Sequence, residues 1–379
     1  MFLPPEIILG ILEPVYYDDL ASPNYSLLSA CSLVCSGWSG PAQTLLFRNP
    51  KQIRLHNSAA FYAAIDSSTF RGQTLGSCVR RLDIRTGRSS NDSCALQEFT
   101  RILLACPRLY ELTLSIYGIH EFANSLLSEL KESTKNLKAL SLIYCGVQSP
   151  IIFQLLEIWH NVQFLKIGTE IVASTPRHDE LVPSATPVVS NAPVRLYDLI
   201  LLRTPSPEIL SWLLEPSLES LRILECREMP GRSTRALLTP HTRRLRSLRL
   251  LHYNLDSAAL LRECTELEEL LLYHIPSIVP LAPDLPQTIQ HFGFWNSISN
   301  HQKTLDPILD AVDSLPRLNV ITCNTNVVEL VDYPRLKAVC EDRNIEIIVT
   351  KVPFWIPEDP VVTRRFPRGR SVSNFGLMG

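Results

Sequence analysis

The chain has 379 residues, with 36 Lys and Arg against 38 Asp and Glu, and a formal net charge of −2. This balance excludes a broadly basic nucleic-acid binder, because neutralising phosphates requires an excess of positive charge. Hydrophobic residues make up 45% of the sequence, which excludes wholesale disorder. Leu occupies 60 positions, Gly 14 and Pro 28, so the composition predicts a leucine-rich core divided into short elements.

The beginning of the sequence has no feature of a secretion or import signal. No basic residue precedes Arg48, and the apolar stretch from Ile7 to Leu12 is short and follows Glu6. A secretory signal needs a basic start and a longer apolar core, and a transit peptide needs early arginines. No run of about 18 apolar residues occurs, so no membrane-spanning helix is expected. We therefore expect a cytoplasmic or nuclear protein with no membrane partner.

Residues 3–49 have the pattern of three short helices. Ile7, Ile11 and Val15 recur every four residues, the helical spacing, and Pro14 should end this first helix near Glu13. A second apolar face runs from Leu27 to Trp38, and Gly40-Pro41 should stop that helix and start a third. Three such helices give a core too small to stand alone easily. From the periodicity alone, the segment is either a cap on the next domain or a separate module.

One apolar phrase then recurs through residues 50–352, in the form apolar-x-x-apolar-x-apolar. Its starts are 22 to 34 residues apart, close to the period of about 20–29 residues in leucine-rich repeats. The phrase begins at Val79, Leu109, Leu137, Val162, Leu196, Leu218, Leu245, Leu267, Ile289 and Leu318. Its last two apolar positions have the two-residue period of a strand.

Helical spacing replaces the strand spacing between these phrases. Apolar residues recur every three or four positions over 96–103, 122–130, 152–159 and 305–312, and Ser206-Pro207 has the form of a helix start. A strand followed by a return helix cannot bury its apolar side alone, so such units stack. The sequence therefore predicts an α/β solenoid, a leucine-rich-repeat horseshoe of parallel strands with return helices, preceded by the three-helix segment.

Two segments depart from the repeats. Residues 173–193 contain four prolines and no periodicity, which predicts a loop insertion at the surface. Residues 353–379 combine prolines with a cluster of four arginines, and this composition predicts a mobile or loosely docked tail. A nuclear-import or anion-binding patch is the alternative for the cluster. The four arginines are Arg364, Arg365, Arg368 and Arg370.

The first segment resembles a known motif. Leu3-Pro4-x-Glu6, together with Val34-Cys35-x-x-Trp38, is similar to the F-box, whose signature has a Leu-Pro-x-Glu start and a Val-Cys-x-x-Trp end. The spacing of Trp38, Ala42, Leu46 and Phe47 also fits that family. The match covers residues 2–49. Its long first loop resembles a group of fungal, basidiomycete-type F-box proteins that also carry degenerate leucine-rich repeats.

The resemblance implies partners. In that family the F-box docks on a Skp-type adaptor of a cullin–RING ubiquitin ligase, and the repeats hold the target protein. Residues 1–49 would be the F-box and residues 50–352 the target-binding solenoid. An exposed apolar stripe on a small helical unit is expected to be covered by a partner. The expected adaptor anchors, carried over by position, are Leu3, Pro4, Ile7, Ile11, Val34, Cys35 and Trp38.

We find no pattern that predicts catalysis or a cofactor. The sequence has no G-x-S-x-G elbow, no phosphate-binding Gly loop and no H-E-x-x-H. Cys31 and Cys35 have no second Cys or His pair at zinc spacing, so no metal site is expected. Five other cysteines lie among Leu, Val and Ile and predict buried thiols: Cys106, Cys145, Cys226, Cys323 and Cys340. We expect a protein that is not an enzyme.

Recognition is therefore expected on the concave face of the solenoid. Large apolar residues are common just after the last strand position of each repeat, towards the C-terminal half. Tyr273 and Trp295 would anchor a target there, unless the tail residues Phe354, Trp355 and Ile356 cover them. Arg222 and Arg249 would form a second, basic spot for an acidic or phosphorylated segment, with solvated surface charges as the alternative.

These observations predict a substrate-recognition adaptor that brings a target to a ubiquitin ligase. The rival interpretation is a leucine-rich-repeat scaffold outside the ligase system, whose first helices only cap the repeats. The two differ in whether the apolar stripe of the first helix is left uncovered by the chain itself.

Overall fold

The computed structural model describes residues 3–86, 92–134, 136–172, 192–228, 231–274, 280–296, 304–352 and 358–379. Contacts divide the chain into two compact units. The first contains Met1–Val194, Asp359–Val361 and Arg370–Gly379, and the second contains Arg195–Glu358 and Val362–Gly369. Both units therefore include a part of the C-terminal segment. The loop insertion predicted at 173–193 lies outside the described residues, except for 192 and 193.

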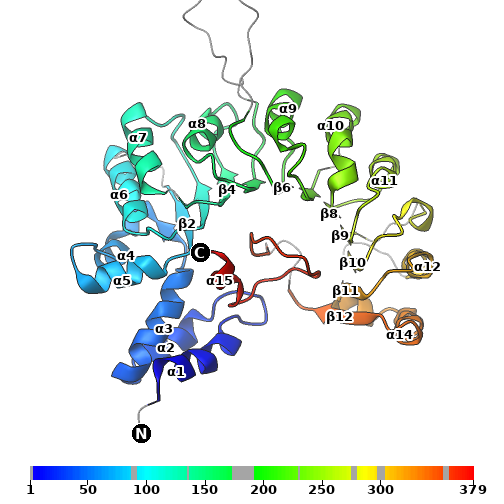
Figure 1. Ribbon diagram of the computed structural model, residues 1–379, viewed down its shortest axis with the longest axis horizontal. Coiled ribbons are helices and arrows are strands. Elements are labelled where there is room, and N and C mark those ends of the chain that lie inside the picture. Colours follow the sequence, from blue (N-terminus) through cyan, green and yellow to red (C-terminus); the bar gives the residue numbers. More distant parts are fainter. Residues whose placement is uncertain are drawn as a thin grey trace, which may run out of the picture. The chain divides into compact units, whose positions relative to one another are not determined.

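The first unit starts with three helices and continues with strands that alternate with helices (Figure 1). The helices are α1 Pro5–Leu12, α2 Tyr25–Ser32, α3 Ser36–Arg48, α4 Ala59–Ala64, α5 Phe70–Cys78, α6 Asp92–Leu104, α7 Asn124–Ser133, α8 Ile151–Ile158 and the C-terminal α15 Asn374–Leu377. The strands are β1 Ile53–Arg54, β2 Arg81–Arg85, β3 Glu111–Ser115, β4 Ala139–Tyr144 and β5 Phe164–Ile167. Two 3₁₀ helices are η1 Glu13–Val15 and η2 Leu55–Asn57.

The second unit repeats the alternation, with its strands side by side and its helices behind them (Figure 1). The strands are β6 Asp198–Leu201, β7 Ile223–Cys226, β8 Ser247–Leu250, β9 Glu269–Leu272, β10 His291–Phe294, β11 Val320–Asn324 and β12 Glu346–Thr350. The helices are α9 Pro207–Leu214, α10 Arg232–Leu238, α11 Leu255–Arg262, α12 Asp306–Ser314, α13 Thr325–Val328 and α14 Tyr333–Asp342. The 3₁₀ helices are η3 Glu215–Ser217, η4 Thr239–Arg244 and η5 Ala282–Asp284.

Within each unit the strands are parallel, and each pairs with its neighbour in the sequence. Residues at the fourth position of the phrase are in register from strand to strand, such as Leu82 with Leu112 and Leu248 with Leu270. These side chains are buried, because alternate residues of a strand point to the same face and the helices cover that face. The structure confirms the predicted α/β solenoid of leucine-rich-repeat type.

The register corrects one repeat and adds two strands. Leu224 and Cys226, not Leu221 and Ile223, are in register with Leu248 and Leu250, so this phrase begins at Leu221 instead of Leu218. The surrounding run of leucines fits the phrase in either position, and only strand pairing separates them. The strands β1 and β12 were not predicted, and they pair with β2 and β11.

Three helices form the N-terminal segment, as predicted, but their boundaries differ from the expectation. The first ends at Leu12, before Pro14. The break before the third helix falls at the extended residue Cys35, so Trp38 belongs to α3. Pro41 lies inside α3 without ending it. Pro41 is the sixth residue of the helix, where a proline removes one backbone hydrogen bond and crowds the carbonyl of residue i−4, and its side chain is buried.

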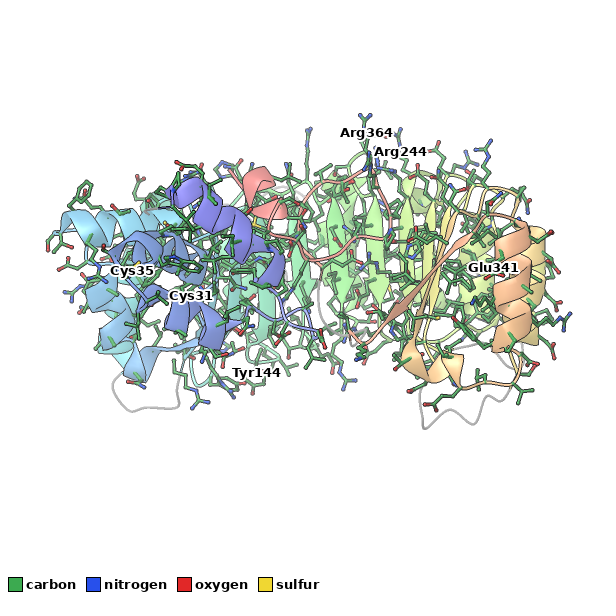
Figure 2. The ribbon with its side chains drawn as sticks, turned by 90° about the horizontal axis from the view of Figure 1, so that it is seen from below. Cys31, Cys35, Tyr144, Arg244, Glu341 and Arg364 are labelled. Carbon is green, nitrogen blue, oxygen red and sulfur yellow. The ribbon has the colours of Figure 1, made fainter. Side chains whose placement is uncertain are left out.

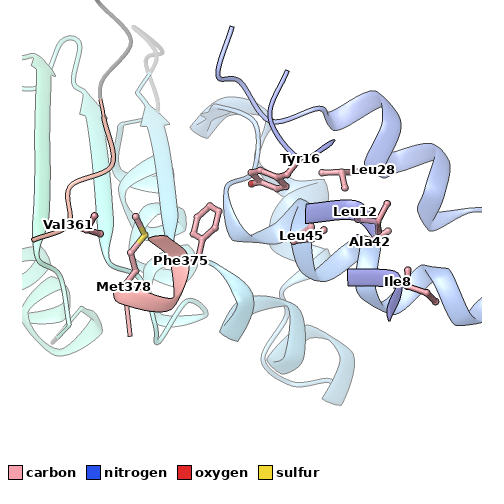
Figure 3. Close-up of a cluster of buried hydrophobic side chains, with 9 residues drawn as sticks. All are labelled: Ile8, Leu12, Tyr16, Leu28, Ala42, Leu45, Val361, Phe375 and Met378. Carbon is pink, nitrogen blue, oxygen red and sulfur yellow. The ribbon is translucent and has the colours of Figure 1, made fainter. Parts of the chain in front are cut away.

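The core of these helices is completed by the C-terminal end of the chain. The cluster contains Ile8, Leu12, Tyr16, Leu28, Ala42, Leu45, Val361, Phe375 and Met378. Phe375 lies between the helical residues and the other two C-terminal residues (Figure 3). Its ring meets that of Tyr16 edge-on, with 5.8 Å between centroids. Against the expected mobile or loosely docked tail, three apolar side chains of residues 358–379 are buried in this core: Val361, Phe375 and Met378.

Two further expectations from the sequence, the buried cysteines and the start of α9, are confirmed by the structure. The five cysteines predicted as buried thiols are buried. Helix α9 begins at Pro207 after the N-cap Ser206, as its sequence predicts. Within the described ranges, no helix has both the length and the hydropathy that a membrane crossing requires.

Candidate protein-interaction sites

The first candidate site is an exposed apolar stripe on α1 and η1. Leu3, Ile7, Ile11 and Val15 follow one another at four-residue intervals and expose 43–52% of their surface. One position further on, Ile8, Leu12 and Tyr16 repeat the same interval and are buried in the core cluster. The helix is therefore apolar on both its inner and outer sides. A helix that is apolar all round is normally buried on every side. Here the inner side is buried and the outer stripe is exposed.

The turn between α2 and α3 adds a second exposed apolar segment. Leu33 exposes 84% of its surface and Val34 66%, and Cys35 is also exposed. Figure 2 shows where Cys35 lies relative to Cys31, which packs against the core cluster. The sequence reasoning missed Leu33, although its place beside Val34 was the available signal.

The structure therefore divides the seven residues predicted as adaptor anchors into two groups. Leu3, Pro4, Ile7 and Ile11 are exposed around α1, and Val34 and Cys35 are exposed at the turn before α3. Trp38 is half-buried and packs against the core cluster, so part of its ring stabilises the three helices. Leu3, Pro4, Ile7 and Ile11 lie along α1 and the two residues before it. Val34 and Cys35 lie in the turn between α2 and α3.

The second candidate site is the concave face of the second unit. The residues that alternate with the core positions along each strand, before and between them, point to this face, and many of them are charged. They include Asp198 in β6, Glu225 in β7, Arg249 in β8, Glu269 in β9 and His291 in β10, all of them buried. We call Asp198, Arg249 and Glu269 the charged floor. The sequence prediction named Arg249 but otherwise used the position after each strand, and so missed Asp198, Glu225, Glu269 and His291.

An ion-pair network links the middle of the charged floor. Arg249 contacts Glu269 at 2.9 Å, and Glu269 contacts Nδ1 of His291 at 2.7 Å. Nε2 of His291 lies 2.9 Å from the hydroxyl of Thr322. Although burial alone would raise the pKa of Glu269, Arg249 and His291 hold it well below its ordinary value. Glu269 is therefore ionised in the folded protein at neutral pH.

The C-terminal segment covers this network. Glu358 contacts Arg249 at 2.7 Å, and Arg368 contacts Glu358 at 2.8 Å and Asp198 at 3.5 Å. The guanidinium of Arg246 lies over the ring of Phe366, 5.5 Å from its centroid. Buried charges are stable only when they are paired. Residues 358 and 362–369 supply opposite charges to Arg249 and Asp198 on the concave face.

The structure buries most of the target site predicted at Tyr273 and Trp295, and it buries Arg249 of the separately predicted basic spot. Tyr273 exposes 2% of its surface and Arg249 4%, and Trp295 is half-buried. The two rings do meet, with 5.6 Å between centroids. Gly293, in register with Leu271, lies against this aromatic pair: an added Cβ would be 3.6 Å from Cζ3 of Trp295 and would require the side chain of Leu271 to move. The tail residues Phe354, Trp355 and Ile356, which were the predicted alternative cover for Tyr273 and Trp295, lie outside the described residues.

Arg222 does not join Arg249 in a basic spot. Arg249 is in register with Glu225, and Arg222 precedes its strand. The guanidinium of Arg222 donates to the carbonyl oxygen of Leu221 at 2.9 Å. The error has the same origin as the misplaced repeat, because a three-residue shift of the phrase moves Arg222 along the strand.

The predicted arginine cluster of the tail is also split. Arg364 and Arg365 are exposed, and Figure 2 shows Arg364 and Arg244 projecting from the same edge of the second unit. Arg368 is buried in the network described above. Arg370 belongs to the first unit, where it donates to the carbonyl oxygen of Ala21 at 3.3 Å. Only two of the four arginines are therefore exposed to an anionic partner.

Asp198 gives a testable pH dependence. Burial raises its pKa from 3.8 to about 6, against the opposing charges of Arg368 and Arg249. Because the folded pKa lies above the unfolded one, this carboxyl stabilises the fold at low pH and that contribution is lost as the pH rises to about 6. We expect Asp198→Asn to remove this loss, measured as the free energy of unfolding in urea across that pH range.

The control for this experiment is Asp306→Asn, which changes a carboxyl with 63% exposure in a surface ion pair. Its pH profile should follow that of the unmodified protein. An Asp198→Asn profile that still falls by the same amount over this range would contradict the assignment.

The geometry defines a leucine-rich-repeat α/β solenoid with an apolar helical surface at its N-terminal end and a charged concave face. In the described part of the chain, no three His, Cys, Asp or Glu side chains are grouped as metal ligands would be. A scan against models of protein families and a search of curated proteins give no match.

Among solved structures, the chain is similar to the leucine-rich repeat-containing protein LegL7 from Legionella pneumophila. The two are 17% identical, with a TM-score of 0.45, and the alignment covers 69% of this chain and 88% of the other.

Proposed function

We propose that residues 3–49 are an F-box that binds a Skp-type adaptor of a cullin–RING ubiquitin ligase, and that the repeats hold a target protein. One observation carries the proposal: the outer stripe of α1 is apolar and uncovered. Leu3, Ile7 and Ile11 expose 43%, 52% and 47% of their surface, while the neighbouring Ile8 and Leu12 are buried. The uncovered residues are among those that the motif resemblance assigns to the adaptor.

A helix with two apolar faces needs a protein surface against each of them. Exposed apolar residues that lie together, rather than singly, are typical of a surface that another protein covers. Laying an apolar helix face into a partner's groove buries residues spaced three or four apart. The rival interpretation, a cap that serves only the repeats, needs the inner face of α1 and gives no role to the outer one.

In this proposal the protein itself performs no chemical step. Holding a target beside a ubiquitin-transferring complex raises their effective concentration, and this requires only two binding surfaces on one chain. The stacked repeats supply the second surface, since solenoids of this kind bind partners along their extended concave face.

The test is a double substitution, Ile7→Glu with Ile11→Glu, in the full-length chain. Both side chains are exposed, and Glu is a good helix former, so we expect the melting temperature to stay within a few degrees. If both residues are central in the interface, capture of a purified Skp-type adaptor should fall about 30-fold or more. The measurement is titration calorimetry or a quantitative pull-down with the purified adaptor.

The full chain is needed because Phe375 and Met378 complete the core of the three helices. The control is Phe70→Glu, which adds one such negative charge at a side chain that exposes 86% of its surface on α5. It should leave adaptor binding unchanged. Equal binding by the double variant and the unmodified chain would overturn the proposal and favour the cap.

A further inference from the structure

The concave face of the second unit is occupied by a segment of the same chain. Glu358 and Arg368 reach the charged floor through contacts of 2.7 Å to Arg249 and 3.5 Å to Asp198. The two residues are also paired with each other at 2.8 Å, so they approach the floor as one carboxylate–guanidinium unit. The contacts are polar, unlike the apolar packing that holds Phe375 in the first unit.

This segment leaves Asp198 incompletely satisfied. The side chain of Asp198 exposes 7% of its surface, and its Oδ2 is 3.5 Å from Nη1 of Arg368. Among the described residues, no donor is hydrogen-bonded to the other oxygen, Oδ1. A buried acceptor without a donor is costly, and an arginine that meets a carboxylate with both nitrogens would satisfy both oxygens. The floor can therefore bind a guanidinium better than its present occupant does.

We propose that the charged floor is a binding site for a segment of the target protein that carries an arginine and an acidic residue, and that Glu358 and Arg368 occupy this site as an intramolecular ligand. The arginine pairs with Asp198 and the acidic residue pairs with Arg249. This inference rests on the proposal that the repeats hold a target, and it specifies the chemistry of that target.

The strand spacing sets the distance between the two charges of the ligand. Asp198 lies on β6 and Arg249 on β8, two strands apart. Neighbouring strands are about 4.8 Å apart, so the two floor residues are separated by roughly 10 Å across the sheet. An extended peptide advances about 3.3 Å per residue. Because Arg249 is also two strand positions beyond the residue level with Asp198, the arginine and the acidic residue of an extended ligand should be about three or four residues apart. Glu358 and Arg368 instead reach the floor from distant positions, because the segment between them folds back and pairs them at 2.8 Å.

The energetics of buried ion pairs allow such an exchange. A buried pair gains little net stability over its separated, hydrated groups, so one matching pair can replace another at low cost. A tethered segment competes with a free one at an effective concentration of the order of millimolar. Weakening the tethered contacts should therefore raise the apparent affinity for a free peptide, while Phe375 keeps residues 370–379 in place.

The experiment measures binding of a labelled peptide that copies residues 358–369 of this chain, by fluorescence anisotropy. The full-length variant Glu358→Gln with Arg368→Met is expected to bind it at least 10-fold more tightly than the unmodified chain. A control peptide with the same two substitutions should bind that variant at least 10-fold more weakly. Adding Asp198→Asn to the variant should weaken binding of the original peptide by a similar factor.

Two outcomes would overturn the inference: equal affinity of the variant and the unmodified chain, or no binding to either at 1 mM peptide. If the double variant does not fold, Arg368→Lys replaces it. This change keeps the charge but loses the planar fork, and we expect about a threefold gain in peptide affinity. Adaptor capture, measured on the same samples, should not change, so a failure here is distinguishable from a failure of the F-box proposal.

Discussion

Replacing Phe375 by Ala is expected to lower the free energy of unfolding of the first unit by about 3–5 kcal/mol, the usual cost of truncating a buried Phe. The side chain exposes 5% of its surface within the core of the three N-terminal helices. Besides the ring of Tyr16, it contacts two cations, with Arg48 and Arg81 at 5.5 and 5.7 Å from its centroid. The substitution removes these contacts and leaves a cavity. Urea unfolding followed by circular dichroism measures the change.

The matched control is Leu377→Ala in the same short helix, α15. Leu377 exposes 60% of its surface, so its truncation should change stability by about 0.5 kcal/mol or less. If Phe375→Ala cost no more than Leu377→Ala, the C-terminal residues would not be part of that core.

A second large effect is expected from Arg81→Met. Arg81 is buried and pairs with Asp359 and Glu111, whose side chains expose 1% and 13% of their surface. Burial alone would lower its pKa, but the two carboxylates raise it, so the guanidinium stays charged. Removing it leaves two buried carboxylates without their cation, which should cost about 3–5 kcal/mol. The measurement is again urea unfolding.

Two comparisons test the explanation. Arg335→Met removes the cation of an exposed pair with Asp306, and this should cost less than about 1 kcal/mol. Adding Asp359→Asn and Glu111→Gln to Arg81→Met should restore part of the lost stability, because no unpaired charge then remains. A triple variant that is less stable than Arg81→Met alone would show that lost hydrogen bonds dominate instead.

Asp359 also accepts hydrogen bonds from groups other than Arg81, and the change to Asn could weaken them. Asp359 accepts from the backbone N–H of Ser371 at 3.1 Å and from the side-chain amide of Asn374 at 2.7 Å. These bonds hold Asp359 to Ser371 and Asn374, all three of which belong to the first unit. Arg81 joins these residues to β2, so one side chain links the C-terminal residues to the repeat sheet.

The repeat architecture could be predicted because its signal is local and redundant. Every unit needs apolar side chains at two strand positions and a helical spacing in between, so ten phrases independently indicate the same fold. The single error, at Leu218, arose where neighbouring leucines fit two registers. The helical nature of residues 3–49 followed from the same kind of pattern, and the exposed stripe of Leu3, Ile7 and Ile11 agrees with the residues that the motif resemblance selected.

The concave face could be predicted only in part. Alternation along a strand determines which residues point to it. Arg249 lies between the two core residues of β8 and was predicted, whereas Asp198 and Glu269 directly precede the first core residue of their strands and could have been found by reading that position. Alternation does not show whether the face is open. Tyr273 and Arg249 are buried there, and Arg249 is covered in part by Glu358, which is itself paired with Arg368. The Pro- and Arg-rich composition around these residues predicted a mobile segment instead.

The sequence by itself determined the period of the repeats, the row of core residues in each strand and the three helices at the start. Each of these depends on contacts between residues close in the chain or on a pattern repeated many times. The tertiary structure alone decided the place of the C-terminal segment, through pairs such as Arg81 with Asp359, 278 residues apart. A single contact between such distant residues has no period, and only the folded chain brings its two charges together.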